Sequence, residues 1–236
     1  MSTSDVRIPL RALAVGAHPD DIEFGCGATL AKWARADAHV ELAVLTDGSK
    51  GTWDPDSDTA ALVATRQEEQ RAAAQTLGAH AVHFLGSVDG ELEADTATRR
   101  RVCEVIRASR PDVVLGHDPW KQYRLHPDHR HAGELVIDGI VAARDPQFFP
   151  DAGAPHRPSL LLLFEAQVVD HVEQVDDDAR RAKVDALLCH HSQWRSTMGI
   201  EAGSPDADAQ HAAFVARVRG EIDTAGGEAF KLLADL

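Results

Sequence analysis

Short apolar runs alternate with longer helix-like segments through most of this chain, and this alternation constrains the fold more than any other feature. The apolar runs lie at residues 10–17, 40–45, 82–85, 113–115 and 160–164. Apolar residues recur at helical spacing near residues 22–35, 60–77, 96–109 and 129–143. Strands that alternate with helices of this length predict right-handed βαβ units. We therefore expect an α/β fold, a Rossmann-like three-layer sandwich with a mostly parallel sheet and C-terminal covering helices.

The length of 236 residues fits one domain of this kind, and no internal repeat divides the chain. We therefore expect residues 1–236 to form a single domain. Residues from about 194 to 236 are rich in alanine and acidic side chains, which predicts a helical C-terminal extension. Gly25-Cys26-Gly27 follows the first strand, but the third glycine of a dinucleotide-binding fingerprint is missing at the proper place. We interpret these glycines as close-packing positions.

The charge balance narrows the class of ligand. Acidic residues outnumber basic residues by 38 to 24, so the formal net charge is -14. Phosphate binding needs clustered lysine and arginine, so this balance argues against a nucleic-acid partner and disfavours a polyanionic substrate. Neutral, sugar-like small molecules stay open as substrates.

Cysteine usage and the absence of long apolar runs bear on the compartment. Cys26, Cys103 and Cys189 form no CxxC pair and are odd in number, which is typical of reduced thiols. Residues 1–10 lack the pattern of a signal peptide, and no apolar run approaches the length of a membrane span. We expect a cytoplasmic protein without membrane contact. The sequence does not decide whether it is a homo-oligomer.

A polar cluster, Ala17-His18-Pro19-Asp20-Asp21, lies between the first predicted strand and the first predicted helix. In α/β proteins such loops lie at the carboxyl edge of the sheet, where ligands bind. One turn here offers an imidazole and two carboxylates, which can bind a divalent metal and leave one carboxylate free as a base. The alternative is that Asp20 and Asp21 only cap the helix that follows.

A second polar cluster follows the fourth predicted strand. Residues 126–131 read HPDHRH, and three histidines with an aspartate in six positions are too dense for a core helix. This density favours a loop with metal-binding or catalytic duty. His131 is an alternative to His129 as a ligand on spacing alone. His117 and Asp118 are candidates for the hydrogen bonds that orient metal ligands.

The two clusters together resemble the PIG-L/LmbE-like family of zinc-dependent N-deacetylases. Further parts of the family pattern occur in order across roughly residues 8–193. They are Thr46-Asp47-Gly48, Arg66 with Glu69, Leu85-Gly86 before Asp89-Gly90, Arg110-Pro111-Asp112-Val113-Val114, and Ala186-Leu187 before His190-His191-Ser192-Gln193. The resemblance implies an enzyme, a metal-dependent hydrolase that acts on linear amide bonds.

The resemblance also implies a set of metal ligands, with His129 as the third. His18, Asp21 and His129 supply two nitrogens and a carboxylate and leave a position open for water, as in catalytic zinc sites. Zinc is the implied ion, although Fe²⁺ or another divalent ion also suits such a set. Asp20 is then the general base that takes the proton of the water.

Four more residues receive roles in this scheme. His126 is the implied donor to the oxyanion, and either it or Asp20 protonates the leaving amine. We expect Asp128 to fix the tautomer of His126 and to favour its charged form. Arg66 and Asp89 are the implied substrate-binding residues, although helix-surface ion pairs and a simple turn are their plainer explanations.

Two aromatic residues and the closing motif have open roles. Trp53, in a loop rich in Asp, Gly, Ser and Pro, is a candidate to stack on a sugar face. Some family members carry a tyrosine just before the second cluster, whereas the tyrosine here, Tyr123, lies three residues ahead of His126. The contacts of residues 190–193 are not evident from sequence.

The leading hypothesis is a zinc-dependent hydrolase that removes the N-acetyl group from an N-acetylglucosamine-type sugar or sugar conjugate. The first alternative is an amidase that cleaves a larger thiol- or antibiotic-type conjugate at the same metal site. A non-catalytic sugar- or nucleotide-binding domain is the third hypothesis, and it predicts neither metal nor amine release.

Overall fold

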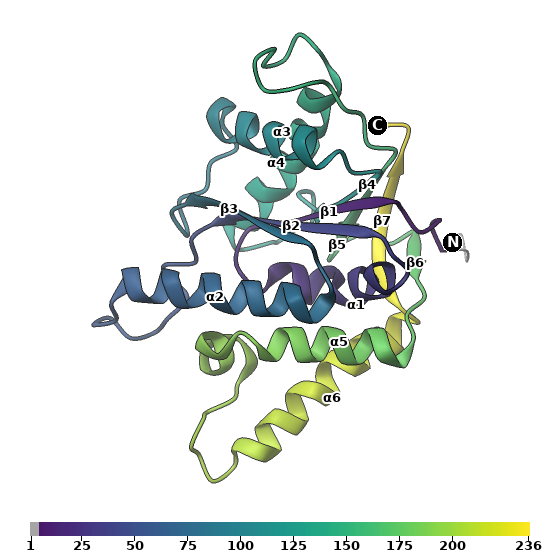
Figure 1. Cartoon of the computed structure of the whole chain (residues 1–236). Helices are drawn as coiled ribbons and strands as arrows, with labels where there is room; N and C mark the ends of the chain where they lie inside the picture. The colour runs from purple at the N-terminus through teal and green to yellow at the C-terminus, as the bar shows by residue number, and fades with distance from the viewer. Residues whose placement is uncertain (1–4) are drawn as a thin grey trace.

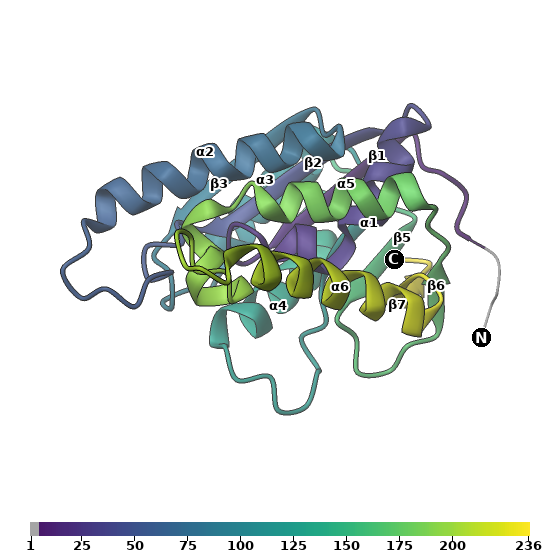
Figure 2. The same ribbon diagram turned by 90° about the horizontal axis from the view of Figure 1, so that it is seen from below.

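The computed structural model describes residues 5–236, which contain a seven-stranded sheet with helices on both faces (Figures 1 and 2). Neighbouring strands follow the order β3-β2-β1-β4-β5-β7-β6. The first five strands pair in parallel, whereas β7 runs antiparallel to both β5 and β6. The strands are β1 (Arg11–Gly16), β2 (His39–Thr46), β3 (Ala81–Ser87), β4 (Val113–His117), β5 (Leu160–Phe164), β6 (His171–Glu173) and β7 (Glu228–Ala234). The predicted α/β fold with a mostly parallel sheet is confirmed.

The helices form two layers and an outer cover. In Figure 1, α3 and α4 lie on one face of the sheet, α1 and α2 on the other, and α5 and α6 lie beyond α1 and α2. The predicted C-terminal covering segment, residues from about 194 onward, contains α6, whereas α5 lies before it and was not among the predicted helices. The helices are α1 (Asp21–Arg35), α2 (Thr59–Leu77), α3 (Thr96–Ser109), α4 (Pro127–Arg144), α5 (Asp177–Leu188) and α6 (Ala207–Ala225), with single turns η1 (His191–Gln193) and η2 (Trp194–Met198) between the last two.

Strand β1 shows how the sheet is buried on both sides. Leu13 and Val15 belong to the apolar cluster under α3 and α4, and Ala12 and Ala14 belong to the cluster under α1. Successive side chains of a strand point to opposite faces, so a strand covered on both sides is apolar throughout. This explains why β1 appears in the sequence as an unbroken apolar run.

Aspartate side chains begin three of the helices. Asp58, Asp95 and Asp176 accept hydrogen bonds from backbone N–H groups in the first turns of α2, α3 and α5. Gly78, with φ of 79°, ends α2 in the left-handed conformation that suits glycine. Part of the acidic excess of the chain therefore serves to start helices.

Helix α1 is interrupted at Cys26, whose φ of -150° is not helical. Gly25 packs directly on the ring of Phe164, because a Cβ at Gly25 would lie 2.4 Å from that ring. Glu228 of β7 accepts hydrogen bonds from two N–H groups in the turn that follows the break, at 3.1 and 2.7 Å. This arrangement supports the interpretation of Gly25 as a close-packing position.

Residues 228–234 correct one sequence prediction. We expected the segment after about residue 194 to be helical, but β7 forms a strand inserted between β5 and β6. Phe230 pairs with Phe164 and is fully buried. A short apolar run has no period of its own that separates strand from helix, so pairing with β5 decides the outcome.

The strand order places a topological switch point between β1 and β4. The chain leaves β1 toward β2 on one side, and β4 continues toward β5 on the other. In open α/β sheets the crevice beyond the carboxyl ends of such strands binds ligands. No helix within residues 5–236 has the length and apolar character of a membrane span.

Candidate metal centre

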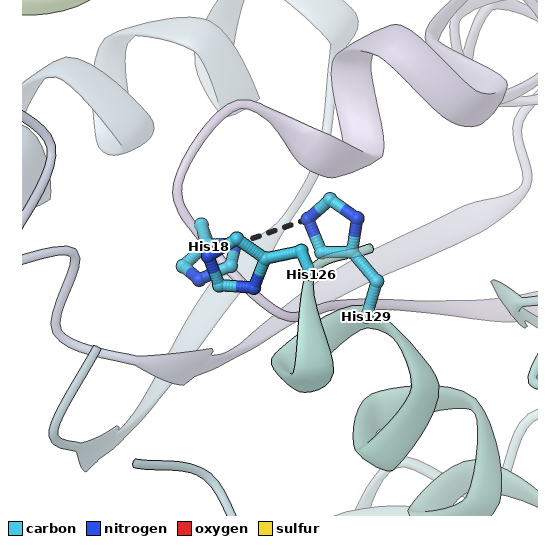
Figure 3. Close-up of side chains that lie close together, drawn as sticks. All are labelled: His18, His126 and His129. Carbon is cyan, nitrogen blue, oxygen red and sulfur yellow. Dashed lines mark hydrogen bonds between the residues drawn. The ribbon is translucent and has the colours of Figure 1, made fainter. Parts of the chain in front are cut away.

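Both polar clusters of the sequence meet at this switch point. His18 and Asp20 follow β1, Asp21 begins α1, and His126 and His129 lie at the start of α4. Figure 3 shows the imidazoles of His18, His126 and His129 gathered together, although His18 and His129 are 111 residues apart in sequence. The structure therefore brings together the three predicted ligands His18, Asp21 and His129.

The ligand atoms have the spacing of a tetrahedral site. His18 Nδ1 lies 3.2 Å from Asp21 Oδ2 and 3.2 Å from His129 Nε2. His129 Nε2 lies 3.3 Å from Asp21 Oδ1. Ligand atoms bound about 2.0–2.1 Å from a tetrahedral zinc ion are about 3.3 Å apart. The two histidine nitrogens have this spacing, and Asp21 presents a different oxygen to each of them. The three groups therefore surround a position that suits a zinc ion or a divalent ion of similar size.

Neighbouring residues widen the choice of ligands. Among residues 5–236, three sets of donor atoms all lie within 4.8 Å of one another: His18 with His126 and His129, Asp21 with His117 and His129, and His18 with Asp89, His126 and Asp128. The predicted ligands are divided among these sets, so His126 and His117 are also candidates. His131 belongs to none of these sets among residues 5–236, and its Nδ1 bonds the carbonyl of Leu92. The alternative of His131 as a ligand is therefore not supported by the geometry.

The centre carries a local excess of negative charge. His18 Nε2 lies 3.1 Å from carboxylate oxygens of both Asp89 and Asp128. Burial alone would lower the pKa of His18, but Asp128, Asp21 and Asp89 outweigh burial and raise that pKa well above its usual value. Buried carboxylates need a compensating cation, which a divalent ion supplies.

Asp20 lies beside the ligands and differs from them in its surroundings. Its side chain makes no capping hydrogen bond, and one carboxylate oxygen lies 3.5 Å from Arg66 Nη2. Burial, opposed by Arg66 and His190, raises the pKa of Asp20 to about 6. A carboxylate with such a pKa can accept and return a proton near neutral pH. The alternative that Asp20 serves only as a helix cap has no support in these contacts.

A pocket of about 300 Å³ opens next to these groups. Of the predicted substrate-binding residues, Asp89 lines it, with Oδ2 accepting a hydrogen bond from the backbone N–H of Lys50 at 3.1 Å. Arg66 also lines it, but its side chain is only 3% exposed, and it donates to the carbonyls of Pro19 and Gly48. The structure thus engages Arg66 in holding the His18–Asp21 loop.

The comparisons with known proteins agree with this geometry. The family described as PIG-L, GlcNAc-PI de-N-acetylase, matches residues 13–140. The chain belongs to the PIG-L family. The resemblance seen in the sequence is confirmed.

Two relatives and one solved structure are similar to this PIG-L protein. Diacetylchitobiose deacetylase of Thermococcus kodakarensis is 35% identical over 188 residues, 78% of this chain and 70% of the relative. The 1D-myo-inositol 2-acetamido-2-deoxy-alpha-D-glucopyranoside deacetylase 2 of Saccharopolyspora erythraea is 32% identical over 167 residues, 61% of each chain. N,N'-diacetylchitobiose deacetylase from Pyrococcus horikoshii, in complex with its inhibitor MPG, has a TM-score of 0.82 and 25% identity, and the match covers 96% of this chain and 84% of that chain.

One predicted pairing in this PIG-L protein is wrong. Asp128 was expected to bind His126, but its carboxylate accepts hydrogen bonds from His18 Nε2 at 3.1 Å and from the backbone N–H of Gly90 at 2.6 Å. His126 stands just before α4 and Asp128 in its first turn, and donor atoms of the two lie within 4.8 Å of each other, but the Asp128 carboxylate is engaged by His18 and Gly90. Burial, with His18 and His129, lowers the pKa of His126, so its neutral form is favoured.

Sequence reasoning missed two residues and left two others open. Arg124 Nη1 lies 2.9 Å from His129 Nδ1, and Arg124 Nη2 binds Glu165 at 2.7 Å. The position of Glu165 directly after the fifth strand was the available signal.

Tyr123 and Trp53 are 85% and 84% exposed, so neither is packed into the centre. His117 was expected to support the ligands, and its Nε2 lies 3.2 Å from Asp21 Oδ2.

Proposed function

We propose that this PIG-L protein is a metal-dependent N-deacetylase that removes the acetyl group from an N-acetylglucosamine-type sugar or sugar conjugate. The observation that carries the proposal is the convergence of His18, Asp21 and His129 beside Asp20, at the wall of a pocket. The names of the two relatives, which concern diacetylchitobiose and a 2-acetamido sugar, support the substrate class.

The ligands would be His18, Asp21 and His129, with zinc as the preferred ion. Such an ion, when bound, supplies an activated water and polarises a carbonyl oxygen. Asp128 accepts a hydrogen bond from His18 Nε2, which leaves His18 Nδ1 free to face the ion. A hydrogen-bond acceptor on the other ring nitrogen fixes the tautomer of a histidine that binds a metal.

The protein's own acid–base groups complete the reaction. Asp20 accepts the proton of the attacking water and returns it to the leaving amine. His126, neutral and exposed to the pocket, donates a hydrogen bond to the oxygen that gains charge as the amide carbonyl is attacked. Asp89, at the pocket wall, accepts a hydrogen bond from a substrate hydroxyl.

The alternative of an amidase for larger conjugates rests on a different observation. Leu125, next to His126, is 90% exposed, and Trp53 and Tyr123 are exposed on loops at the same edge of the sheet. Such apolar side chains suit a bulky aglycone. A comparison of rates on short N-acetyl sugars and on bulky acylated conjugates separates the two substrates.

The first test is metal content by mass spectrometry for the wild type and His129→Ala, both purified without chelator. We expect about one divalent ion per wild-type chain and its loss in the variant. The wild type is then screened for amine release from N-acetyl sugars. A folded wild type that holds no metal and takes up no added zinc would overturn the proposal.

A second test addresses the base. Asp20→Asn should lower kcat by about 10²–10⁴-fold while metal content stays at the wild-type level, because only the proton acceptor is removed. The measurement is steady-state amine release together with metal analysis. Wild-type turnover in Asp20→Asn would exclude Asp20 as the base.

A further inference from the structure

Behind Asp20 lies a series of buried polar side chains to which the proposed reaction gives no role. It consists of Gln70 on α2, Glu23 on α1 and His190 after α5, each fully buried. Buried polar groups of this kind require a reason, since an incompletely paired one is costly. The sequence motif that contains His190 was also left without a function.

The first contact is with the backbone of Asp20. Gln70 Oε1 accepts a hydrogen bond from the N–H of Asp20 at 3.1 Å, and Arg66 Nη2 donates to the carbonyl of Pro19 at 2.6 Å. These two groups belong to the same peptide unit, between Pro19 and Asp20. Arg66 and Gln70 are one turn apart on α2 and therefore face the same side. Helix α2 thus holds both ends of a single peptide bond.

The held peptide has an unusual conformation. Asp20 has φ of 98°, in the left-handed region that residues other than glycine rarely adopt. Such a conformation persists only where the surroundings impose it. The contacts from Arg66 and Gln70 supply this constraint, and they determine where the Asp20 carboxylate lies.

The second contact fixes the orientation of Gln70. Its Nε2 donates to Glu23 Oε1 at 2.6 Å. A backbone N–H only donates and a carboxylate only accepts, so the Gln70 amide satisfies both partners in one orientation alone. Glu23 therefore determines which way Gln70 presents its oxygen to Asp20.

The last contact pairs Glu23 with His190. Glu23 Oε2 lies 3.6 Å from His190 Nε2, and neither atom has a hydrogen-bond partner within residues 5–236. His190 is held in place because the N–H and hydroxyl of Ser192 donate to Glu69 on α2, at 2.7 and 2.6 Å. The closing motif is therefore anchored on the same helix that holds the Asp20 peptide.

The geometry points to His190, Glu23 and Gln70 as positioning residues that together hold the peptide of Asp20 and so aim its carboxylate at the side of the pocket lined by His18, Asp21 and His129. This inference rests on the proposed role of Asp20. It gives the His190–Gln193 motif a function in turnover although His190 is fully buried and absent from the residues that line the pocket.

The test uses the full-length protein with its metal and the variant His190→Gln, which removes the basic group but keeps a hydrogen-bond donor. We expect kcat to fall about 10- to 100-fold, with KM within about threefold and metal content unchanged. We also expect amide hydrogen exchange at Asp20 to become at least about tenfold faster, because its bond to Gln70 loosens. Glu23→Gln should also lower kcat, because a glutamine at this position can donate as well as accept and no longer fixes the orientation of Gln70.

The matched control is His171→Gln. His171 is also a buried histidine paired with a buried glutamate, Glu173, at 2.7 Å, but it lies in β6 at the far edge of the sheet. It should affect stability without changing kcat or exchange at Asp20. Unchanged kcat in His190→Gln, or equal losses in both variants, would overturn the inference. If the wild type cleaves no acetylated sugar but His190→Gln still makes exchange at Asp20 faster, the positioning role would be supported and the proposed function contradicted.

Discussion

At the scale of single residues, the backbone fixes the place of each proposed metal ligand. His18 follows a strand directly, Asp21 begins a helix, and His129 lies in the first turn of another. Sequence reasoning could name these ligands, but it could not identify the hydrogen-bond partner of Asp128. Its carboxylate binds His18, which comes from the opposite side of the switch point, and only the assembled sheet brings the two together.

Asp128 yields a prediction about metal affinity. Asp128→Asn weakens the hydrogen bond that orients His18, so zinc affinity should fall about 10- to 100-fold. Competition with a fluorescent chelator measures it. Asp118→Asn is the control, because Asp118 accepts hydrogen bonds from the backbone of Trp120 and Gln167 and contacts no predicted ligand. Equal affinity in the wild type and Asp128→Asn would show that His18 needs no such partner.

At the scale of elements, the helix-like and apolar patterns located the parallel strands and most helices, but not β6, β7 or α5. Residues 228–234 become a strand because β5 offers a free edge and Phe230 fills a place beside Phe164. The break in α1 was likewise invisible in sequence. It depends on Glu228, which arrives from 200 residues away to bind the N–H of Ala28.

The close packing of α1 on β5 is testable at Gly25. Gly25→Ala should destabilise the protein by about 1–3 kcal/mol, because the new Cβ would meet the Phe164 ring at 2.4 Å. Gly220→Ala in α6 is the control. No heavy atom lies within 4 Å of a Cβ at Gly220, so that change should stabilise the helix by about 0.5–1 kcal/mol. Urea unfolding measures both, and equal stabilities would contradict the packing argument.

At the scale of the whole molecule, the amino edge of the sheet carries a group of polar side chains around Glu41, the Glu41 cluster, which is remote from the metal centre. Glu41 of β2 accepts hydrogen bonds from His83 at 2.7 Å, from Ser109 of α3 at 2.7 Å and from Arg11 of β1 at 3.0 Å. This carboxylate therefore links three strands and a helix. Burial opposes its ionisation, but His83, Ser109 and His39 outweigh burial and lower the pKa of Glu41 to about 2.

The Glu41 cluster predicts how stability depends on pH. The folded pKa of about 2 is below the ordinary value of 4.5, so the contribution of Glu41 is present above pH 4.5 and is lost as the pH falls toward 2. Glu41→Gln should therefore reduce the loss of unfolding free energy between pH 5.5 and pH 3 by on the order of 1 kcal/mol, allowing for solvent screening. Denaturant titrations at both pH values measure it. Parallel pH profiles for the wild type and Glu41→Gln would contradict the prediction.

The position of β7 also has a consequence for the growing polypeptide. Leu160–Phe164 forms the most apolar strand of the sheet, and one of its edges is covered only by residues 228–234. Until those residues emerge from the ribosome, β5 presents unpaired backbone groups along an apolar edge, the kind of surface that pairs with other chains. The nascent protein is therefore most prone to aggregation after the metal-binding residues have been made and before residues 228–234 have emerged to close the sheet.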